Sequence, residues 1–316
     1  MIQSSAHFDA RRHFEPDAVG IGANCSTGVC RAVITNILYP VDFSSSCVAM
    51  AAYVRRAARL LGAKVSLIHV VDLIRSNGFE LYSRSVQEIA EEHRNIAKEK
   101  LDSFLTAEFP LAECPRVLTS GEPATEIARA VREGRFDLII MPTHAGFFRQ
   151  MLLGSTTAKV LNYADCPVLT STHAETIAPR PLEHREWLCA IDLGTDSERV
   201  LLFAMETAAQ AHGSVSILHV VRGYDPDLPI QLNVDEQTRS VQEALRRSAE
   251  LQRVIGIEAT VRIASGPVKK ALLEEVGHSD ADVLVIGRRP MTGVYGRMRG
   301  LTSAVIRASP VPVLSI

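Results

Sequence analysis

The chain has 316 residues, of which 47% are hydrophobic, and a formal net charge of −2. This length is enough for two domains of ordinary size, and the nearly balanced charge gives no electrostatic argument for binding nucleic acid or a charged membrane surface. No apolar run approaches the roughly 20 residues that span a bilayer, and residues 1–16 lack the apolar core of a signal peptide, so we expect a cytoplasmic protein.

The first segment, residues 1–33, has no counterpart in the rest of the chain. It lacks a sustained apolar period and gathers five ionisable side chains between positions 11 and 17, which predicts a flexible N-terminal extension. Its Cys25 and Cys30 do not have the spacing of a metal-binding knuckle, and we interpret them as two ordinary thiols.

After this extension the sequence alternates strand and helix signals. Apolar runs predict strands over 34–41, 65–71, 116–118, 138–141 and 167–171. Periods of 3.6 residues predict a first helix whose apolar face runs from Cys47 to Leu61, and further helices over 84–108, 122–133 and 155–163. Ser44 or Ser45 is the expected N-cap of the first helix. Strand alternating with helix predicts an α/β fold, with a parallel sheet covered by helices on both faces.

The second half repeats this pattern. Asp42 and His69 recur 150 residues later as Asp192 and His219, and Pro167-Val-Leu recurs 145 residues later as Pro312-Val-Leu. A repeat of this length predicts a duplicated domain, because each copy is large enough to bury its own core. We therefore expect domain 1 over 34–173, a proline-containing linker over 174–185 and domain 2 over 186–316.

Ligands of open parallel sheets bind beyond the carboxyl ends of the strands. In domain 1 these ends carry Asp42 after the first strand, Val70 and Asp72 at the end of the second, and a loop that leads to Gly154. Gly154 allows a close backbone approach, and residues 155–157 offer three hydroxyls and N–H groups at a helix start, where a phosphate is favoured.

Three motifs resemble those of the universal stress protein family: Tyr-Pro-Val-Asp-Phe-Ser over 39–44, Leu-Ile-His-Val-Val-Asp over 67–72, and Met-Pro-Thr-His over 141–144 with Leu-Leu-Gly-Ser-Thr-Thr over 152–157. The resemblance covers about 34–173 and 186–316. It implies two tandem domains, each with a five-stranded parallel sheet, in a family whose members divide into ATP binders and non-binders. Single-domain members pair through their last strands, so strands 167–171 and 312–316 are expected to form an internal pseudo-dimer, to which a further homodimer could be added.

The resemblance also implies a site for ATP, accompanied by Mg, in domain 1. Asp42 takes the position that contacts the nucleoside, Val70 the position whose backbone reads adenine, and Gly154, Ser155 and Thr157 the phosphate-loop positions. Pro142 and Ala145 replace two glycines of the binding motif, the loop is one residue short, and Gly146 is the candidate replacement. The expected site set is Pro40, Asp42, Val70, Met141, Gly146, Gly154, Ser155, Thr156 and Thr157.

Domain 2 carries a degenerate version of this site. Leu301 stands where a hydroxyl residue should follow Gly300, or, at the offset of 145, Arg299-Gly300 stands opposite Gly154-Ser155. The loop is basic, with arginines that we interpret as a solvated surface: Arg288, Arg289, Arg297 and Arg299.

The sequence shows no Ser-His-Asp order, metal-spaced cluster or carboxylate pair, so we assign no catalytic or metal-binding residue. His69 and His219 lie in apolar strands and are expected to be structural, and Asp42 and Asp192 could simply cap the following helices. The predicted function is a stress-response regulator or sensor that binds adenine nucleotide and a protein partner not identified by the sequence. Two alternatives stay open: a protein-interaction scaffold without nucleotide, and a weak ATPase or self-phosphorylating enzyme using Ser155 or Thr157.

Overall fold

The computed structural model describes residues 33–72, 86–143, 153–171, 185–221, 223, 234–288 and 296–316. The predicted flexible extension and nearly all of the linker lie outside these residues, as do Cys25, Cys30, His144, Ala145, Gly146 and Arg289. No described helix has the length and apolar character needed to cross a membrane.

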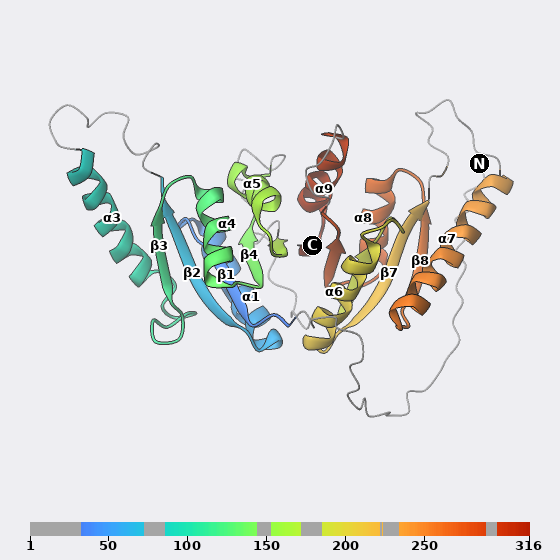
Figure 1. The fold of residues 1–316 in the computed structure, drawn as a ribbon, viewed down its shortest axis with the longest axis horizontal. Coiled ribbons are helices and arrows are strands. Elements are labelled where there is room, and N and C mark those ends of the chain that lie inside the picture. Colours follow the sequence, from blue (N-terminus) through green and yellow to red (C-terminus); the bar gives the residue numbers. More distant parts are fainter. Residues whose placement is uncertain are drawn as a thin grey trace. The chain divides into compact units, whose positions relative to one another are not determined.

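Domain 1 contains five parallel strands in the order β3-β2-β1-β4-β5 (Figure 1). Its helices and strands alternate as predicted: β1 (Asn36–Pro40), α1 (Ser45–Leu61), β2 (Lys64–Val71), α3 (Val86–Ser103), β3 (Arg116–Ser120), α4 (Pro123–Gly134), β4 (Leu138–Pro142), α5 (Ser155–Tyr163) and β5 (Val168–Ser171).

Domain 2 repeats the arrangement, with parallel strands in the order β8-β7-β6-β9-β10. Its elements are β6 (Glu186–Ala190), α6 (Ser197–Gln210), β7 (Ser214–Val221), α7 (Val234–Ile255), β8 (Thr260–Ser265), α8 (Val268–His278), β9 (Val283–Ile286), α9 (Gly296–Ala308) and β10 (Val313–Ser315). The prediction of two α/β domains is therefore confirmed.

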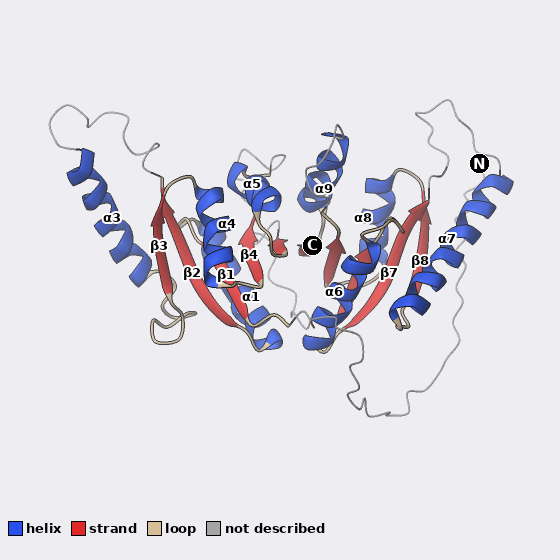
Figure 2. Cartoon of the chain, in the orientation of Figure 1, coloured by secondary structure: helices blue, strands red, loops and turns tan. Residues whose placement is uncertain are grey.

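Helices cover both faces of the strands in each domain (Figure 2). One apolar cluster contains the inner faces of α1 and α6 and is lined by strand residues such as Ile37, Leu67 and Val285. The other contains the inner faces of α4, α5, α8 and α9, with strand residues such as Leu38 and Leu284. Alternate residues of each strand thus enter opposite clusters, as expected for a parallel sheet buried on both sides.

Local signals place the first helix where it was predicted. Ser44 is the N-cap of α1 and accepts a hydrogen bond from the Cys47 amide at 3.4 Å. Gly62 ends the helix with a left-handed φ of 60°, which glycine adopts without steric cost.

The predicted helix over 84–108 is too long at its end. In the structure α3 ends at Ser103, and Leu105 has a positive φ of 53°. The cause lies on β3, where the Arg116 guanidinium donates to the carbonyls of Leu101, Phe104, Phe109 and Cys114. An arginine 15 residues after Leu101 thus folds back the segment after the helix, and the helical period alone carried no sign of this contact.

The two domains share one sheet through their last strands. β5 pairs with β10 in antiparallel orientation, with Leu169 opposite Leu314, and the Thr170 hydroxyl donates to Val313 O at 3.3 Å. On α6, Gln210 Nε2 donates to Leu61 O at 2.5 Å and to Ile34 O at 2.7 Å, and Gln210 Oε1 accepts from the Ile34 amide at 3.0 Å. Hydrogen bonds therefore join domain 2 to both the start and the first helix of domain 1.

Candidate functional site

The carboxyl ends of β1, β2 and β4 form the candidate site of domain 1. β1 lies between β2 and β4, and the amide of Val41, just after β1, donates to Ile68 O at 2.8 Å. The helix that follows β1 packs in one apolar cluster and the helix that follows β4 packs in the other. The chain therefore leaves these two neighbouring strands toward opposite faces of the sheet. Such a switch point is where open α/β sheets bind ligands.

The structure brings four of the predicted residues to these strand ends. Pro40 ends β1 and Asp42 follows it, Val70 is the next-to-last residue of β2, and Met141 lies at the end of β4. Pro40 and Met141 are buried, Val70 is half-buried and Asp42 is exposed. Asp42 is therefore the polar side chain of this group that reaches solvent.

The Asp42 carboxylate is held at the entrance to α1. Its Oδ1 accepts from the Ser44 amide at 3.0 Å and lies 3.3 Å from Cys47 Sγ. Between them Phe43 adopts φ of 65°, a left-handed conformation that is rare outside glycine and asparagine. The N-cap itself is Ser44, so Asp42 orders the turn before the helix and keeps a fixed orientation at the strand ends.

The N-terminus of α5 forms the phosphate side of the predicted site. Gly154 is its N-cap, with φ −55° and ψ 140°, and no side chain caps the helix. By contrast, Ser44 caps α1 and Glu122 caps α4 through their side chains. Among the described residues, the first amide groups of α5 thus lack the side-chain acceptor that the starts of α1 and α4 have, which suits an anionic ligand.

The three hydroxyl residues of α5 differ in their surroundings. Ser155 is exposed and Thr156 is half-buried, whereas Thr157 is fully buried and its hydroxyl donates to Pro142 O at 3.3 Å. The Thr157 hydroxyl therefore ties α5 to the end of β4 and is already engaged by the protein, which leaves the hydroxyls of Ser155 and Thr156 as the more accessible ones. Gly146, also predicted here, lies outside the described residues.

The strand histidines have the structural role that was expected. His69 Nδ1 lies 2.8 Å from Val41 O, and His219 Nδ1 lies 2.9 Å from Ile191 O. Burial lowers the pKa of His69 from its ordinary value of 6.5, and the Phe43 ring lies 4.3 Å from its imidazole ring, centroid to centroid. Each histidine joins its strand to the carbonyl after the neighbouring strand.

Domain 2 builds the equivalent region differently. α9 begins at Gly296, so Gly300 lies inside the helix and the amide groups from Gly300 to Thr302 bond within it. Asp192 keeps the turn geometry of Asp42, because its Oδ1 accepts from the Gly194 amide at 2.8 Å and the Ser197 hydroxyl at 3.3 Å. The acidic residue is retained, but the helix start that would receive a phosphate is displaced.

One arginine of the basic loop is not a solvated surface residue, and this interpretation was wrong. The Arg288 guanidinium is largely buried and donates to Leu161 O at 2.7 Å and Cys166 O at 2.6 Å, both in domain 1. Burial lowers the pKa of Arg288, although arginine stays protonated in proteins. Thr143 stands at the corresponding position of domain 1, so comparing the repeats could have drawn attention to this residue.

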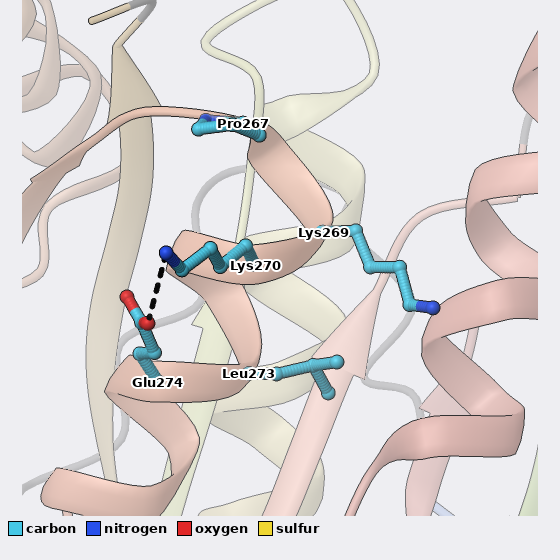
Figure 3. A pocket seen from close by; sticks show the side chains of 5 residues that line it. All are labelled: Pro267, Lys269, Lys270, Leu273 and Glu274. Atoms are coloured by element: carbon cyan, nitrogen blue, oxygen red, sulfur yellow. Dashed lines mark ion pairs between the residues drawn. The ribbon is translucent and has the colours of Figure 1, made fainter. Parts of the chain in front are cut away.

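No cluster of three metal-ligating side chains occurs among the described residues. A hollow of about 550 Å³ lies on the outside of α8 in domain 2, lined by Pro267, Lys269, Lys270, Leu273 and Glu274 (Figure 3). Lys270 and Glu274, one turn apart on α8, form an exposed ion pair of 3.9 Å, and none of the predicted site residues lines the hollow. We therefore assign it no ligand.

Comparisons with known proteins agree with this architecture. The sequence matches the Universal stress protein family over residues 34–171 and 184–316. A universal stress protein of Mycolicibacterium smegmatis is 25% identical over 292 residues, which cover 89% of this chain and 96% of that protein. Universal stress protein A homolog 1 of Coxiella burnetii is 24% identical over 142 residues, or 43% of this chain and 97% of that protein.

A solved structure shows the same tandem fold. The crystal structure of a universal stress protein from Archaeoglobus fulgidus is 25% identical, with a TM-score of 0.66 over 89% of this chain and 97% of that one. The two matched regions together cover most of the sequence and coincide with the two α/β domains. The chain belongs to the universal stress protein family.

Proposed function

We propose that this protein is a cytoplasmic stress-response regulator or sensor whose domain 1 binds an adenine nucleotide, namely ATP with Mg. The observation that carries the proposal is the start of α5, which follows Gly154 directly and has no side-chain cap among the residues that the structure describes. Phosphate groups bind such helix starts through backbone N–H groups and the helix dipole.

The residues at the strand ends fit the other parts of a nucleotide. An oriented, exposed carboxylate at Asp42 is suited to accept hydrogen bonds from ribose hydroxyls. The backbone of Val70, near the end of β2, is the part that we assign to the adenine edge. Gly154, Ser155, Thr156 and the Thr157 amide would hold the phosphates. Mg would bind mainly through those phosphates, as is common for this ion, with Asp42 and Asp72 as nearby carboxylates.

We infer that the two domains act as an internal pseudo-dimer. The antiparallel pairing of β5 with β10 supports this, because it covers the edge that each last strand would otherwise expose. A homodimer of such chains and an unidentified protein partner would extend the assembly.

The scaffold alternative has its own support in domain 1. Pro142 offers no N–H to a ligand, and the Thr157 hydroxyl bonds to a protein carbonyl. A nucleotide-free protein would use the same strand ends only to order α1 and α5. For the ATPase alternative, the described residues offer no base paired with Ser155 or Thr157, so we propose no catalytic step.

The experiment that separates these functions is native mass spectrometry of the full chain purified without added nucleotide, followed by calorimetry with MgATP. We expect a bound adenine nucleotide or a saturable heat with one site per chain. If no nucleotide is bound and millimolar MgATP gives no heat, the nucleotide site is rejected and the scaffold is favoured. Product formation after long incubation would instead support the ATPase.

A further inference from the structure

The contact between Arg288 and domain 1 has no equivalent in the reverse direction. Arg288 follows β9 and its amide donates to Ile316 O at 2.6 Å, just as Thr143 follows β4 and its amide donates to Ser171 O at 3.0 Å. The two residues therefore occupy matching positions. The Thr143 hydroxyl returns to Ser171 O within its own domain at 3.1 Å, whereas the Arg288 side chain crosses to the other domain.

The groups that receive Arg288 belong to the end of α5. Leu161 lies in the last turn of this helix, where carbonyl groups have no intrahelical partner, and Cys166 lies between the helix and β5. Two hydrogen bonds from one guanidinium fix both carbonyls in a planar arrangement. A positive charge at a helix C-terminus also interacts favourably with the helix dipole.

The arrangement of Arg288 is specific and not a casual surface contact. Although the residue as a whole is half-buried, its guanidinium is largely buried, and its Nε has no hydrogen-bond partner among the described residues. A solvated arginine would avoid such a loss of hydration. Two short bonds to the carbonyls of domain 1 are therefore what holds the guanidinium in this place.

α5 depends on contacts of this kind because it has only nine residues, and an isolated helix of that length is unstable in water. Its start is tied to β4 through Thr157 and Pro142, and its end is tied to domain 2 through Arg288. The same helix presents the amides of residues 155–157 to the proposed phosphate site.

We propose that domain 2 acts as a built-in positioning subunit for domain 1: Arg288, which directly follows Gly287 after β9, seats the C-terminus of α5 and thereby sets how well the N-terminus of α5 binds phosphate. This inference rests on the proposed nucleotide site for its functional consequence. The seating of α5 itself does not depend on nucleotide.

The test uses the full chain with Arg288→Met, which keeps an apolar stem and removes both bonds, and Arg288→Lys, which keeps the charge but has a single donor nitrogen in place of the two that bond here. The matched control is Arg132→Met, because Arg132 on α4 forms an exposed 3.2 Å ion pair with Asp165, also near the end of α5. Amide hydrogen exchange of the 155–163 segment is measured without nucleotide, and MgATP affinity is measured by calorimetry.

We expect Arg288→Met to speed amide exchange in α5 by about tenfold or more. The loss of one hydrogen bond from a charged donor changes the equilibrium constant for local opening by about that factor. α1 and α8 should change much less. The exchange rate of α5 in Arg288→Lys should lie between those of Arg288→Met and the parent, and Arg132→Met should match the parent. MgATP affinity should be lowest in the variant whose α5 exchanges fastest.

Unchanged exchange in α5 of Arg288→Met would overturn the proposal, as would an equal rise across all helices, which would indicate only a loss of global stability. If Arg288→Met does not fold, the comparison between Arg288→Lys and Arg132→Met decides in the same way. If exchange follows the expected order but no variant, including the parent, binds MgATP, the seating of α5 stands and the proposed nucleotide site fails.

Discussion

The segments that follow the carboxyl ends of the strands differ more between the two domains than the sheets themselves do. Both domains place a carboxylate after the first strand, at Asp42 and Asp192, and both hold it by a short turn before the first helix. The helices after the fourth strands diverge: α5 begins at Ser155, whereas α9 begins at Gly296 and includes Gly300 in its interior.

This difference shows that the sheet and the ligand-binding edge can change separately. The strands and their covering helices must bury apolar area in both domains, so their pattern is retained. The residue that follows Gly287 after β9 has a different task. In domain 2 this residue is Arg288, which bonds to the neighbouring domain.

The strongest test of this comparison exchanges the matching glycines for valine. Gly154 has φ −55°, which any residue adopts, so Gly154→Val should fold normally but place a branched side chain against the phosphate. We expect MgATP affinity to fall by at least about a hundredfold. The valine side chain would keep the phosphate away from the backbone, so that several hydrogen bonds to amide groups are lost at once. Calorimetry measures the change.

Gly300→Val is the control for this prediction. It lies in α9, where no described atom outside the nearby helix backbone and chain neighbours comes within 4 Å of the added Cβ, so it should leave affinity unchanged and raise helix stability slightly. The assignment of the site to domain 1 would be reversed if binding survived Gly154→Val and disappeared with Gly300→Val.

The domains also differ in how their long helices fill the core. Leu101 on α3 and Ser248 on α7 are both fully buried, and Ser248 Oγ has no hydrogen-bond partner among the described residues. Leu101→Ala should lower the free energy of unfolding by about 3 kcal/mol through a cavity. Ser248→Ala should raise it by about 1 kcal/mol, because it removes an unpaired buried hydroxyl.

Urea denaturation of the two variants measures both changes. Equal losses in the two helices would contradict the difference between the domains. A loss in Ser248→Ala alone would mean that the hydroxyl is paired in solution.

Much of the fold could be predicted from the sequence because it depends on local apolar periodicity. The predicted strand over 138–141 and helix over 155–163 agree with β4 and α5 within one residue. The errors lie where a distant side chain decides the backbone. The end of α3 is set by Arg116, 15 residues beyond Leu101, and no helical period contains that information.

The candidate site was predictable only in part for the same reason. Motif positions indicate which residues follow the strand ends, and the structure brings Asp42, Val70 and Met141 to one edge. They do not reveal that the Thr157 hydroxyl turns to Pro142 O or that Arg288 crosses to the other domain. Such partners depend on side-chain directions that the sequence leaves open.

A smaller effect is expected at the first helix of each domain. Ser44 accepts a hydrogen bond from the Cys47 amide, whereas Asp196, the N-cap of α6, makes no side-chain capping bond. Ser44→Ala should therefore lower the unfolding free energy by about 1 kcal/mol, and Asp196→Ala should change it by less than about 0.5 kcal/mol. Equal losses of unfolding free energy in Ser44→Ala and Asp196→Ala, measured by urea denaturation, would show that the two helix starts are equivalent.

The smallest effect concerns pH and the histidine of β2. Burial lowers the pKa of His69 below its ordinary value of 6.5, while its bond to Val41 O and the charge of Asp42 oppose the shift. The unfolded chain therefore binds the proton first as pH falls, and the folded state binds fewer protons in that range. The contribution of His69 to stability is complete above about pH 6.5 and is lost as pH falls from there toward its lower folded pKa.

His69→Asn keeps a donor toward Val41 O but cannot take up a proton. We expect the unfolding free energy of this variant to fall less between pH 7.5 and pH 5.5 than that of the parent, as measured by urea denaturation at both values. His219→Asn removes the ring that makes the matching bond to Ile191 O, and at pH 7.5 it controls for the loss of the imidazole itself. Parallel losses in the parent and His69→Asn would show that the buried position of His69 does not affect its titration, and the acid sensitivity would then belong to other groups.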